Sequence, residues 1–334
     1  MPPKISVLLP CRNVDAVLED AAVSLRVQTL SDFEIVAVDD GSTDCTWQFL
    51  LDWAASDPRV RPLRTGGRGI AAALATAQAY ARGELIARMD ADDIADPGRL
   101  EAQAHLLDTR PKLAGCGTHV RYFPRSELRQ GALRYEAWLN GLTSADAVAR
   151  EIFVECPVAH PTLMLRRSAL LAVGGYREMG WPEDYDLVLR LWATGHRLAV
   201  VPEVLLHWRD SPERASRRDP RYEPAAFRRC KVHFLARTLA AGREIVVWGA
   251  GRVGKAFARE LVAQGVPLRA FVDLDPRKIG QEVYGVEVVA PDRIDQFRDA
   301  FTVAAVGSPG ARAEIRQSLD RAGRVELRDY CAVA

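Results

Sequence analysis

The sequence has no C-x-x-C pair, no apolar run near the roughly 18 residues that cross a bilayer, and almost no net charge. Six scattered cysteines argue against a zinc module and against a dense disulfide framework. A formal net charge of +1 gives no sign of nucleic-acid binding. The residues after Met1 lack the apolar core and cleavage site of a signal peptide. We therefore expect a cytoplasmic protein whose contact with a membrane, if any, is peripheral.

The amino-terminal part of the chain alternates short apolar runs with helical patterns. Apolar residues make up 48% of the 334 residues, and this length favours about two domains. Predicted strands and helices alternate over residues 5–9, 14–27, 33–38, 60–63, 70–82 and 84–89. The alternation predicts an α/β fold with a parallel sheet, on which chemistry gathers at the carboxyl ends of the strands. Residues 111–206 are less regular and are interpreted as the second half of the same domain.

A second alternation begins at Glu244 and predicts a small separate α/β domain. Its strands and helices are expected over residues 245–248, 253–264, 268–272, 301–306 and 311–322. The preceding residues 209–243, here called the basic segment, carry nine arginines and one lysine against four acids, a local net charge of +6. This segment is either a solvated helix or a surface for anionic phospholipid or a lipid phosphate. We expect three parts: a first domain over 1–208, a basic helical linker over 209–242 and a Rossmann-like domain over 243–334.

Two clusters of acidic residues follow predicted strands. The first, in residues 39–44 (DDGSTD), has a structural explanation as a turn followed by a helix cap. The second consists of Asp90, Asp92 and Asp93. Three acids at one strand end repel one another unless a cation or hydrogen-bond donors offset them. Hard divalent cations prefer oxygen ligands of this kind, so the second cluster points to a metal site.

Five short motifs occur in a fixed order over residues 4–215. They are ISVLLPCRN (5–13), VDDGSTD (38–44), ARMDADDI (87–94), AHPT (159–162) and PEDYDL (182–187). Together they resemble the family 2 glycosyltransferases of GT-A fold. The resemblance implies a GT-A type nucleotide-diphospho-sugar transferase domain that acts in polysaccharide biosynthesis.

The resemblance also implies roles for individual residues at the donor side. Asp40 would accept a hydrogen bond from the base of a nucleotide-diphosphate sugar. Asp92, in the family's DXD motif, would be the main ligand of a Mg²⁺ or Mn²⁺ that bridges the donor diphosphate. Asp90 would lie against the ribose or the cation. The same nucleotide pocket would be lined by Pro10, Arg12 and Asn13.

At the acceptor side, Asp184 resembles the family's general base. It would remove the proton of the acceptor hydroxyl, and the anomeric configuration would invert. Without the resemblance, Glu183 and Asp184 are explained as acids that complement a helix dipole. His160 either contacts the acceptor or only forms a hydrogen bond in a buried turn.

Two positions depart from the family pattern. Arg68 lies in a stretch where many relatives carry asparagine, so it either turns its charge toward phosphate or contributes nothing. Ser211 stands where many relatives carry a histidine, and His207 is four residues away. The completeness of the metal shell is therefore open.

A glycine-rich turn marks the predicted carboxyl-terminal domain. Gly249, Gly251 and Gly254 form G-x-G-x-x-G between a strand and a helix, and Asp273 ends the next strand. This context is typical of a dinucleotide fingerprint. The segment is short for a full dinucleotide fold, however, and has no recognisable hydride-transfer site. It predicts either a second site, for NAD or another nucleotide, or a packing or oligomerisation module.

The leading hypothesis is an inverting, metal-dependent hexosyltransferase. It would move a sugar from a nucleotide-diphosphate donor, of the UDP-sugar type, to a glycan or lipid-linked acceptor. One alternative is an NAD-dependent sugar-nucleotide oxidoreductase or epimerase that uses the carboxyl-terminal domain. Another is a non-catalytic sugar-nucleotide sensor. The sequence leaves open the sugar and the acceptor. It also leaves open the oligomeric state, for which a homo-oligomer is one alternative.

Overall fold

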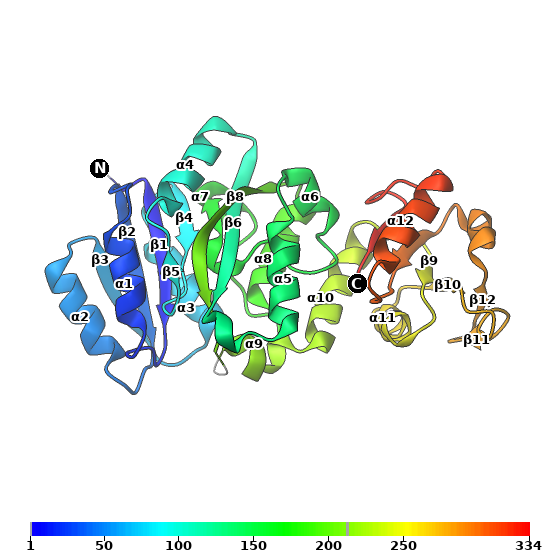
Figure 1. Cartoon of the computed structure of the whole chain (residues 1–334), viewed down its shortest axis with the longest axis horizontal. Coiled ribbons are helices and arrows are strands. Elements are labelled where there is room, and N and C mark those ends of the chain that lie inside the picture. The colour runs from blue at the N-terminus through cyan, green and yellow to red at the C-terminus, as the bar shows by residue number, and fades with distance from the viewer. Residues whose placement is uncertain (1, 212–213) are drawn as a thin grey trace. The chain divides into compact units, whose positions relative to one another are not determined.

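The chain divides into two compact units. The computed structural model describes residues 2–211 and 214–334, with only the backbone described at 215 and 216. Unit 1 comprises Met1–Ala149 and Pro157–Arg218, and unit 2 comprises Arg150–Cys156 and Asp219–Ala334. Each unit contains its own β-sheet with helices beside it (Figure 1). The predicted α/β class with a second, smaller α/β domain is confirmed.

Unit 1 contains an eight-stranded mixed sheet in the order β3-β2-β1-β4-β7-β6-β8-β5. Its strands are β1 (Ile5–Cys11), β2 (Phe33–Asp40), β3 (Val60–Thr65), β4 (Leu85–Arg88), β5 (Ile94–Ala95), β6 (Leu113–Phe123), β7 (Met164–Arg166) and β8 (Arg197–Arg209). Strands β3, β2, β1 and β4 run parallel, whereas β7 is antiparallel to both of its neighbours. The predicted parallel opening of the domain is therefore confirmed, with strand ends shifted by a few residues.

Helices flank this sheet and bury an apolar core against it. They are α1 (Leu18–Arg26), α2 (Thr46–Ser56), α3 (Ile70–Tyr80), α4 (Arg99–Thr109), α5 (Gln130–Asn140), α6 (Ala145–Arg150), α7 (Arg167–Ala172), α8 (Glu183–Ala193) and α9 (Ala215–Arg218), with the 3₁₀ turns η1 (Arg125–Glu127) and η2 (His160–Thr162). Helix α3 packs on β1 and β2, and α2 packs on β3 (Figure 1). Strand β2 is buried along its whole length, as expected for a central strand covered on both faces.

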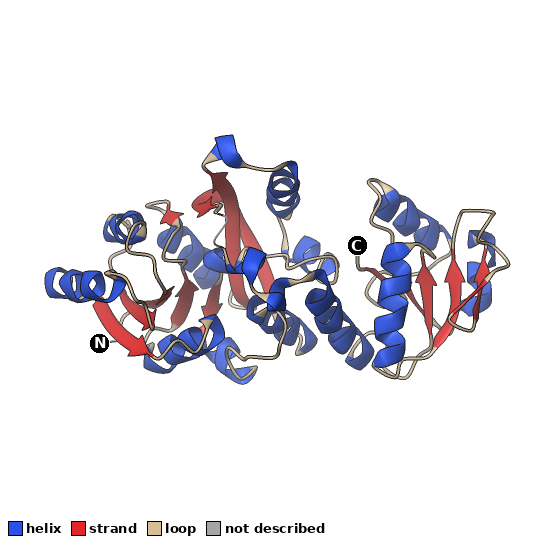
Figure 2. Ribbon diagram, turned by 90° about the horizontal axis from the view of Figure 1, so that it is seen from below, coloured by secondary structure: helices blue, strands red, loops and turns tan. Residues whose placement is uncertain are grey.

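Unit 2 contains a six-stranded sheet in the order β11-β12-β10-β9-β13-β14. Its elements are η3 (Pro220–Tyr222), α10 (Pro224–Arg237), β9 (Ile245–Trp248), α11 (Arg252–Ala263), β10 (Leu268–Val272), β11 (Glu282–Val283), β12 (Val286–Val289), η4 (Pro291–Phe297), β13 (Phe301–Ala304), α12 (Ala311–Arg321) and β14 (Tyr330–Ala332). All neighbouring strands except β11 and β12 are parallel. Figure 2 shows these strands side by side with helices packed along them.

A short segment from the middle of the chain, Arg150–Cys156, belongs to unit 2. Glu151 accepts hydrogen bonds from Arg312 and Arg316 of α12, each at 2.7 Å. The buried Lys231 of α10 donates to the backbone oxygen of Val154 at 2.6 Å. The segment is thus held to two helices of unit 2 by charged hydrogen bonds.

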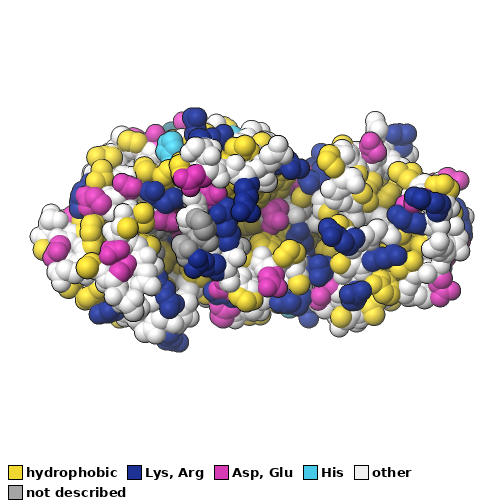
Figure 3. All heavy atoms as spheres, turned by 60° about the horizontal axis from the view of Figure 1, so that its bottom comes forward, with side chains coloured by type: hydrophobic (Ala, Val, Ile, Leu, Met, Phe, Trp, Pro, Cys, Tyr) yellow, Lys and Arg dark blue, Asp and Glu magenta, His cyan; other side chains and the backbone are white. Residues whose placement is uncertain are grey.

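The basic segment is distributed over both units, and part of its positive charge is neutralised locally. Arg217 pairs with Asp210, and Arg221 pairs with Asp219. Figure 3 shows Lys and Arg side chains interspersed with acidic ones on the face drawn there. Pro212 and Glu213 lie outside the described residues. In the described part of the chain, every helix is too short or too polar to cross a membrane.

Candidate active site

The carboxyl ends of β1, β2 and β4 meet at one edge of the sheet in unit 1. Cys11 is paired with Asp39 across β1 and β2, and Leu8 is paired with Arg88 across β1 and β4. The residues that follow these strands therefore come together, as expected for a parallel sheet. They include most of the residues predicted from the first three sequence motifs.

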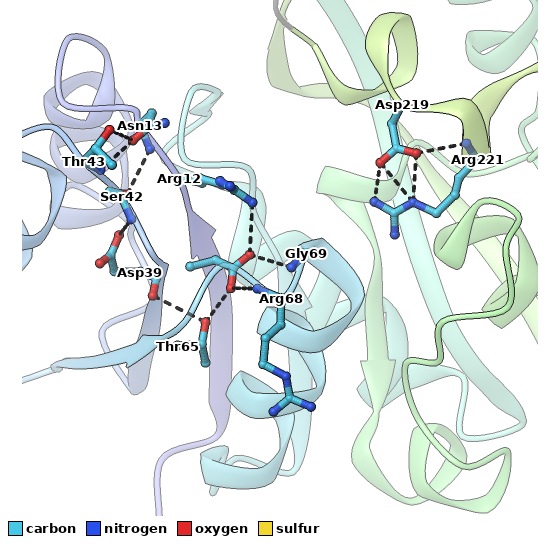
Figure 4. Close-up of polar contacts among 11 residues, drawn as sticks. Arg12, Asn13, Asp39, Ser42, Thr43, Thr65, Arg68, Gly69, Asp219 and Arg221 are labelled. Atoms are coloured by element: carbon cyan, nitrogen blue, oxygen red, sulfur yellow. Dashed lines mark hydrogen bonds and ion pairs between the residues drawn. The ribbon is translucent and has the colours of Figure 1, made fainter.

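The turn after β2 is held by side chains on both sides of it. Asp39 accepts a hydrogen bond from the amide of Ser42, and Ser42 Oγ accepts one from the amide of Asn13 at 2.9 Å. The side-chain oxygen of Asn13 in turn accepts from the amide of Thr43 (Figure 4). Asn13 has a φ of 52°, a left-handed conformation that asparagine tolerates. These bonds fix the turn between the predicted nucleotide-pocket residues.

Asp40 is the most strongly hydrogen-bonded acid of this region. Its carboxylate accepts from Thr65 Oγ1 at 2.6 Å and from the amides of Arg68 and Gly69 at 2.8 and 2.7 Å. Burial alone would raise the pKa of Asp40, but these donors, together with the Arg12 guanidinium, lower it below its usual value. Asp40 is therefore ionised and oriented before any ligand arrives.

The other predicted pocket residues differ in how they reach Asp40. Arg12 turns its guanidinium toward the carboxylate, with Nη1 at 3.8 Å from Oδ2 (Figure 4). Arg68 contacts Asp40 through its backbone amide, and its side chain points away (Figure 4). Pro10 lies half-buried near the end of β1, paired with Val38. Arg12 and the amide of Arg68 thus lie beside one carboxylate, and Pro10 lies on the neighbouring strand.

The cluster after β4 brings three carboxylates together. Oxygen atoms of Asp90, Asp92 and Asp93 all lie within 4.8 Å of one another. Asp93 is fully buried, and its Oδ1 accepts from the amide of Arg209, whereas Oδ2 has no hydrogen-bond partner in the described part of the chain. Burial raises the pKa of Asp92 to about 6, with the charge of Asp90 acting in the same direction. Burial and the two neighbouring carboxylates raise the pKa of Asp93 well above its usual range.

Three arginines surround the cluster but do not neutralise it. Arg88 donates to Asp90, and the Arg209 side chain donates to the backbone oxygen of Asp92 at 2.7 Å. The half-buried Arg214 lies over the ring of Trp208 at 4.5 Å. The raised pKa of Asp92 persists although both Arg209 and Arg214 lower it. The negative charge of the cluster is therefore only partly neutralised by these arginines.

These residues fit a hard divalent cation. All three candidate ligands are carboxylate oxygens, which Mg²⁺ and Mn²⁺ prefer. The unpartnered, fully buried Oδ2 of Asp93 is an acceptor without a donor among the described residues. A cation within reach of Asp90, Asp92 and Asp93 would satisfy that oxygen and relieve the repulsion that raises the pKa values.

The predicted acceptor side lies at the start of α8. Glu183 is buried in the first turn of this helix, and Asp184 beside it is half-buried. Nδ1 of His160 lies 3.8 Å from Glu183, and its Nε2 lies 3.1 Å from the hydroxyl of Tyr176. Burial, with a smaller contribution from the charge of Arg88, lowers the pKa of His160 well below its usual value. His160 is therefore neutral near pH 7.

Arg88, which the sequence motifs did not predict as a site residue, donates to Asp90 of the acid cluster and interacts electrostatically with Glu183 at the start of α8. Its side chain is only 2% exposed, and its Nε and Nη1 have no hydrogen-bond partner among the described residues. Burial raises the pKa of Tyr176, and the charges of Arg88, Glu183, Asp184 and Asp90 all act on it as well. These groups therefore lie near one another. An arginine inside a buried strand is the one signal that could have identified Arg88, because a buried charge requires partners.

The two positions that depart from the family pattern lie along and after β8. His207 is paired with Ile94, and its ring lies edge-on to Phe123 at 6.4 Å. Ser211 follows the strand and is half-buried. The residue of this stretch that bonds to the acid cluster is Arg209. An arginine thus contacts the cluster in the stretch where the resemblance led us to expect a histidine.

The four residues of the predicted second site lie together in unit 2. Gly249, Gly251 and Gly254 span the turn between β9 and α11. Asp273 follows β10, and its carboxylate accepts from the amide of Ala250 at 2.8 Å. The turn and the acid are therefore joined directly.

Comparison with known proteins identifies the family. Residues 6–174 match the sequence profile of the family described as "Glycosyl transferase family 2". The amylovoran biosynthesis glycosyltransferase AmsE of Erwinia amylovora is 29% identical over 202 residues, which are 60% of this chain and 73% of that protein. The O-antigen biosynthesis glycosyltransferase WbnJ of Escherichia coli is 29% identical over 189 residues, covering 56% of this chain and 71% of that protein.

Solved structures agree in fold. S. aureus TarS in complex with UDP-GlcNAc matches with a TM-score of 0.58 and 18% identity, over 70% of this chain and 67% of that chain. The mannosyltransferase PcManGT from Pyrobaculum calidifontis, in complex with GDP-Man and Mn²⁺, matches with a TM-score of 0.53 and 19% identity, over 79% of this chain and 76% of that chain. Unit 1 has the GT-A type fold that the sequence motifs predict. With the profile match over half its length, the chain belongs to glycosyltransferase family 2.

Proposed function

We propose that unit 1 transfers a sugar, with inversion, from a nucleotide-diphosphate sugar to a hydroxyl of a glycan or lipid-linked acceptor. The observation that carries the proposal is the cluster of Asp90, Asp92 and Asp93, whose carboxylates lie within 4.8 Å of one another and are short of positive charge. The names of AmsE and WbnJ, which refer to amylovoran and O-antigen biosynthesis, favour a glycan acceptor.

The acid cluster would hold a Mg²⁺ or Mn²⁺. Asp92 is the proposed main ligand, with Asp90 and the buried Asp93 beside it. A cation bound there supplies Lewis-acid stabilisation of the negative charge that develops on the departing diphosphate. The Mn²⁺ in the complex of PcManGT is consistent with this assignment.

The donor's nucleoside would lie at the edge formed by β1 and β2. Asp40 is ionised and buried, and three donors of the chain already fix its orientation. One acceptor position of its carboxylate remains for the base, with Pro10 and Arg12 beside it. The complex of TarS with UDP-GlcNAc supports a UDP-sugar, whereas that of PcManGT with GDP-Man supports a GDP-sugar. We assign the UDP-sugar and make the GDP-sugar an outcome of the test.

Asp184 would act as the general base. Asp184 lies in the first turn of α8, where the helix dipole favours a negative charge. Its side chain is half-buried, so part of it remains accessible to an acceptor. Removal of the acceptor proton during attack opposite the leaving group makes a single displacement, which inverts the anomeric centre. Glu183 and the neutral His160 would position the acceptor beside it.

The direct test measures nucleotide release from UDP-GlcNAc and GDP-Man with and without Mn²⁺. We expect release from the UDP-sugar that requires the cation. Asp92→Ala should lower it by about 100-fold or more, because the cation would lose its main ligand. Asp184→Asn should lower transfer to an acceptor by about 100-fold or more, because the variant cannot take up a proton.

Asp52→Asn is the matched control, because Asp52 is an exposed carboxylate on α2 that accepts a hydrogen bond from Gln48. Its turnover should equal that of the wild type. Wild-type turnover in both Asp92→Ala and Asp184→Asn would refute the assigned roles. Preference for GDP-Man would correct the donor without affecting the roles of the carboxylates.

A further inference from the structure

A cavity of about 850 Å³ opens in unit 2, separate from the acid cluster of unit 1. It is lined by the turn between β9 and α11, by Asp273, Leu274 and Lys278 after β10, by residues 305–309 after β13, and by one face of α12. In the order β12-β10-β9-β13, the chain leaves β9 toward one side of the sheet and later returns to the other. Ligands of parallel α/β sheets bind at such a switch point.

The three glycines of the turn have different structural reasons. Gly249 has a φ of 118°, and a Cβ there would lie 2.7 Å from Val306. A Cβ at Gly254 would lie 1.7 Å from the backbone oxygen of Gly249. Gly251, by contrast, has a φ of −89° that any residue adopts, and a Cβ there would meet nothing within 4 Å. Gly251 therefore lacks a packing reason to be glycine, and its missing side chain leaves space in the cavity.

The charged side chains of the cavity have a small positive excess. Arg252, Lys278 and Arg321 line it against Asp273 and Glu314. Lys278 pairs with Asp273 at 2.9 Å. Among the described residues, neither Arg252 nor Arg321 is in an ion pair. An anionic ligand would supply the negatively charged partner that these two arginines lack among the described residues.

The start of α11 supplies further donors at the same wall. This helix has 12 residues, and its N-cap is Gly251. No side chain in the described part of the chain caps its first amides. Amides at a helix start, next to a backbone without a side chain, accommodate phosphate oxygens. The remaining walls are largely apolar, with Trp248, Leu274 and Pro291 among the lining residues, as in sites that hold a base.

Asp273 is more fully engaged by this chain's own donors than the acid of a typical dinucleotide site. In dinucleotide sites an acid at this position accepts hydrogen bonds from ribose hydroxyls. Here its carboxylate already accepts from the amides of Ala250 and Asp275 and from Lys278. Three of its roughly four acceptor positions are therefore used, and recognition of two ribose hydroxyls is largely blocked.

We propose that this cavity is a metal-independent binding site for a nucleoside diphosphate, either free or as part of a nucleotide sugar. The diphosphate lies at Gly251 and the start of α11, between Arg252 and Arg321, and the nucleoside lies against Leu274 and Pro291. Amides and arginines hold the diphosphate here, whereas in unit 1 a cation is proposed to do so. The proposal does not depend on transferase activity in unit 1.

The test is calorimetric titration of the full chain with UDP, GDP, ADP, CDP and NAD⁺ in EDTA, which removes the cation proposed for unit 1. We expect one of the four diphosphates to bind with a Kd below about 1 mM. Gly251→Val should weaken this binding by about tenfold or more, because its side chain would fill the space for the phosphates, while the ligand-free melting temperature stays unchanged. Arg321→Glu should weaken it as well, by reversing a charge at the opposite wall.

Two controls separate this site from other causes. Ala263→Val enlarges an exposed side chain at the far end of α11 and should bind like the wild type. Asp52→Asn, on the exposed face of α2 in unit 1, should also bind like the wild type in EDTA. Hydrogen exchange should show protection of residues 249–254 by the bound nucleotide. The proposal is overturned if no diphosphate binds at about 5 mM, if Gly251→Val and Arg321→Glu both bind normally, or if NAD⁺ binds more tightly than all four diphosphates.

Discussion

Both units place acidic side chains directly after a strand of a parallel sheet, but they compensate the charge in different ways. In unit 2, Asp273 is bonded to Lys278 and to two amides, which lower its pKa although burial acts to raise it. In unit 1, burial raises the pKa of Asp92 and of Asp93. The negative charge of neighbouring carboxylates raises both pKa values further. The acid after β10 in unit 2 is therefore neutralised, as Asp40 at the end of β2 is, whereas the cluster after β4 in unit 1 is not.

The difference in charge balance is the basis for the different ligands that we propose for the two units. An under-compensated acid cluster gains stability from a cation, and a diphosphate can bind there once that cation is present. A glycine-rich turn with a compensated acid and two arginines that pair with no carboxylate among the described residues would gain stability from an anion directly. Strand-end position alone is therefore a weak guide to chemistry, and charge balance decides.

The largest effect is expected from replacing Arg88, the buried arginine beside the acid cluster of unit 1. Arg88→Leu removes the partner of Asp90 and the positive charge near Glu183, so turnover should fall by about 100-fold. The cluster also becomes more negative, so the Mn²⁺ concentration at half-maximal rate should decrease. Arg88→Lys should be intermediate, because it keeps the charge without the planar fork.

The measurement is sugar-nucleotide turnover over a Mn²⁺ series, with the melting temperature as a check on folding. Turnover within about twofold of wild type would remove Arg88 from the site. A loss of turnover with weaker Mn²⁺ binding would show that Arg88 mainly supports the fold of the cluster.

The next largest effect concerns the glycines of unit 2. Gly254→Ala should destabilise this unit by about 3 kcal/mol, since the added carbon would lie 1.7 Å from the oxygen of Gly249. Gly251→Ala should change stability by less than about 0.5 kcal/mol, because nothing lies near the added carbon. Hydrogen exchange of β9 in both variants measures the difference. Equal protection in the two variants would contradict the assigned packing of the turn.

A smaller effect of opposite sign is expected in unit 1. Asp93→Asn keeps an oxygen to accept from Arg209 but removes a buried charge without a full set of partners. In EDTA the variant should therefore be more stable than the wild type by about 1 kcal/mol. With Mn²⁺ the wild type should gain stability and the variant should gain less. Thermal melts with and without the cation measure both changes, and a less stable variant in EDTA would show that the cluster is compensated after all.

Much of the fold and part of the site could be predicted from the sequence. The parallel strands β1, β2 and β4 are near-continuous apolar runs, and their ends differ from the prediction by only a few residues. Strand β6 was not predicted, because Gly115 and Gly117 interrupt its strand pattern. Both glycines are required by close neighbours: a Cβ at either position would lie 2.4 Å from another side chain. Such a contact between distant segments is not visible in local sequence.

The site shows the same limit. Asp40, Asp90 and Asp92 follow predicted strands and could be identified by their position. The role of Arg88 depends on burial and on partners that are far apart in sequence, such as Tyr176. Motifs therefore predict which acids gather, and the structure supplies the charge balance around them.

The smallest expected effect is the pH response of Asp273. A carboxyl group with a lowered pKa in the folded state binds fewer protons than in the unfolded chain, so its stabilisation is complete above the unfolded pKa of about 4. It is lost as the pH falls through the lower folded value. Asp273→Asn should therefore cost about 1 kcal/mol or less near pH 7, and this cost should shrink below about pH 4. Hydrogen exchange of β9 in urea, measured for the wild type and for Asp273→Asn at each pH, gives the difference in their stability. A cost that grew with acidity would mean that Asp273 is as poorly compensated as the cluster in unit 1, and the contrast between the units would fail.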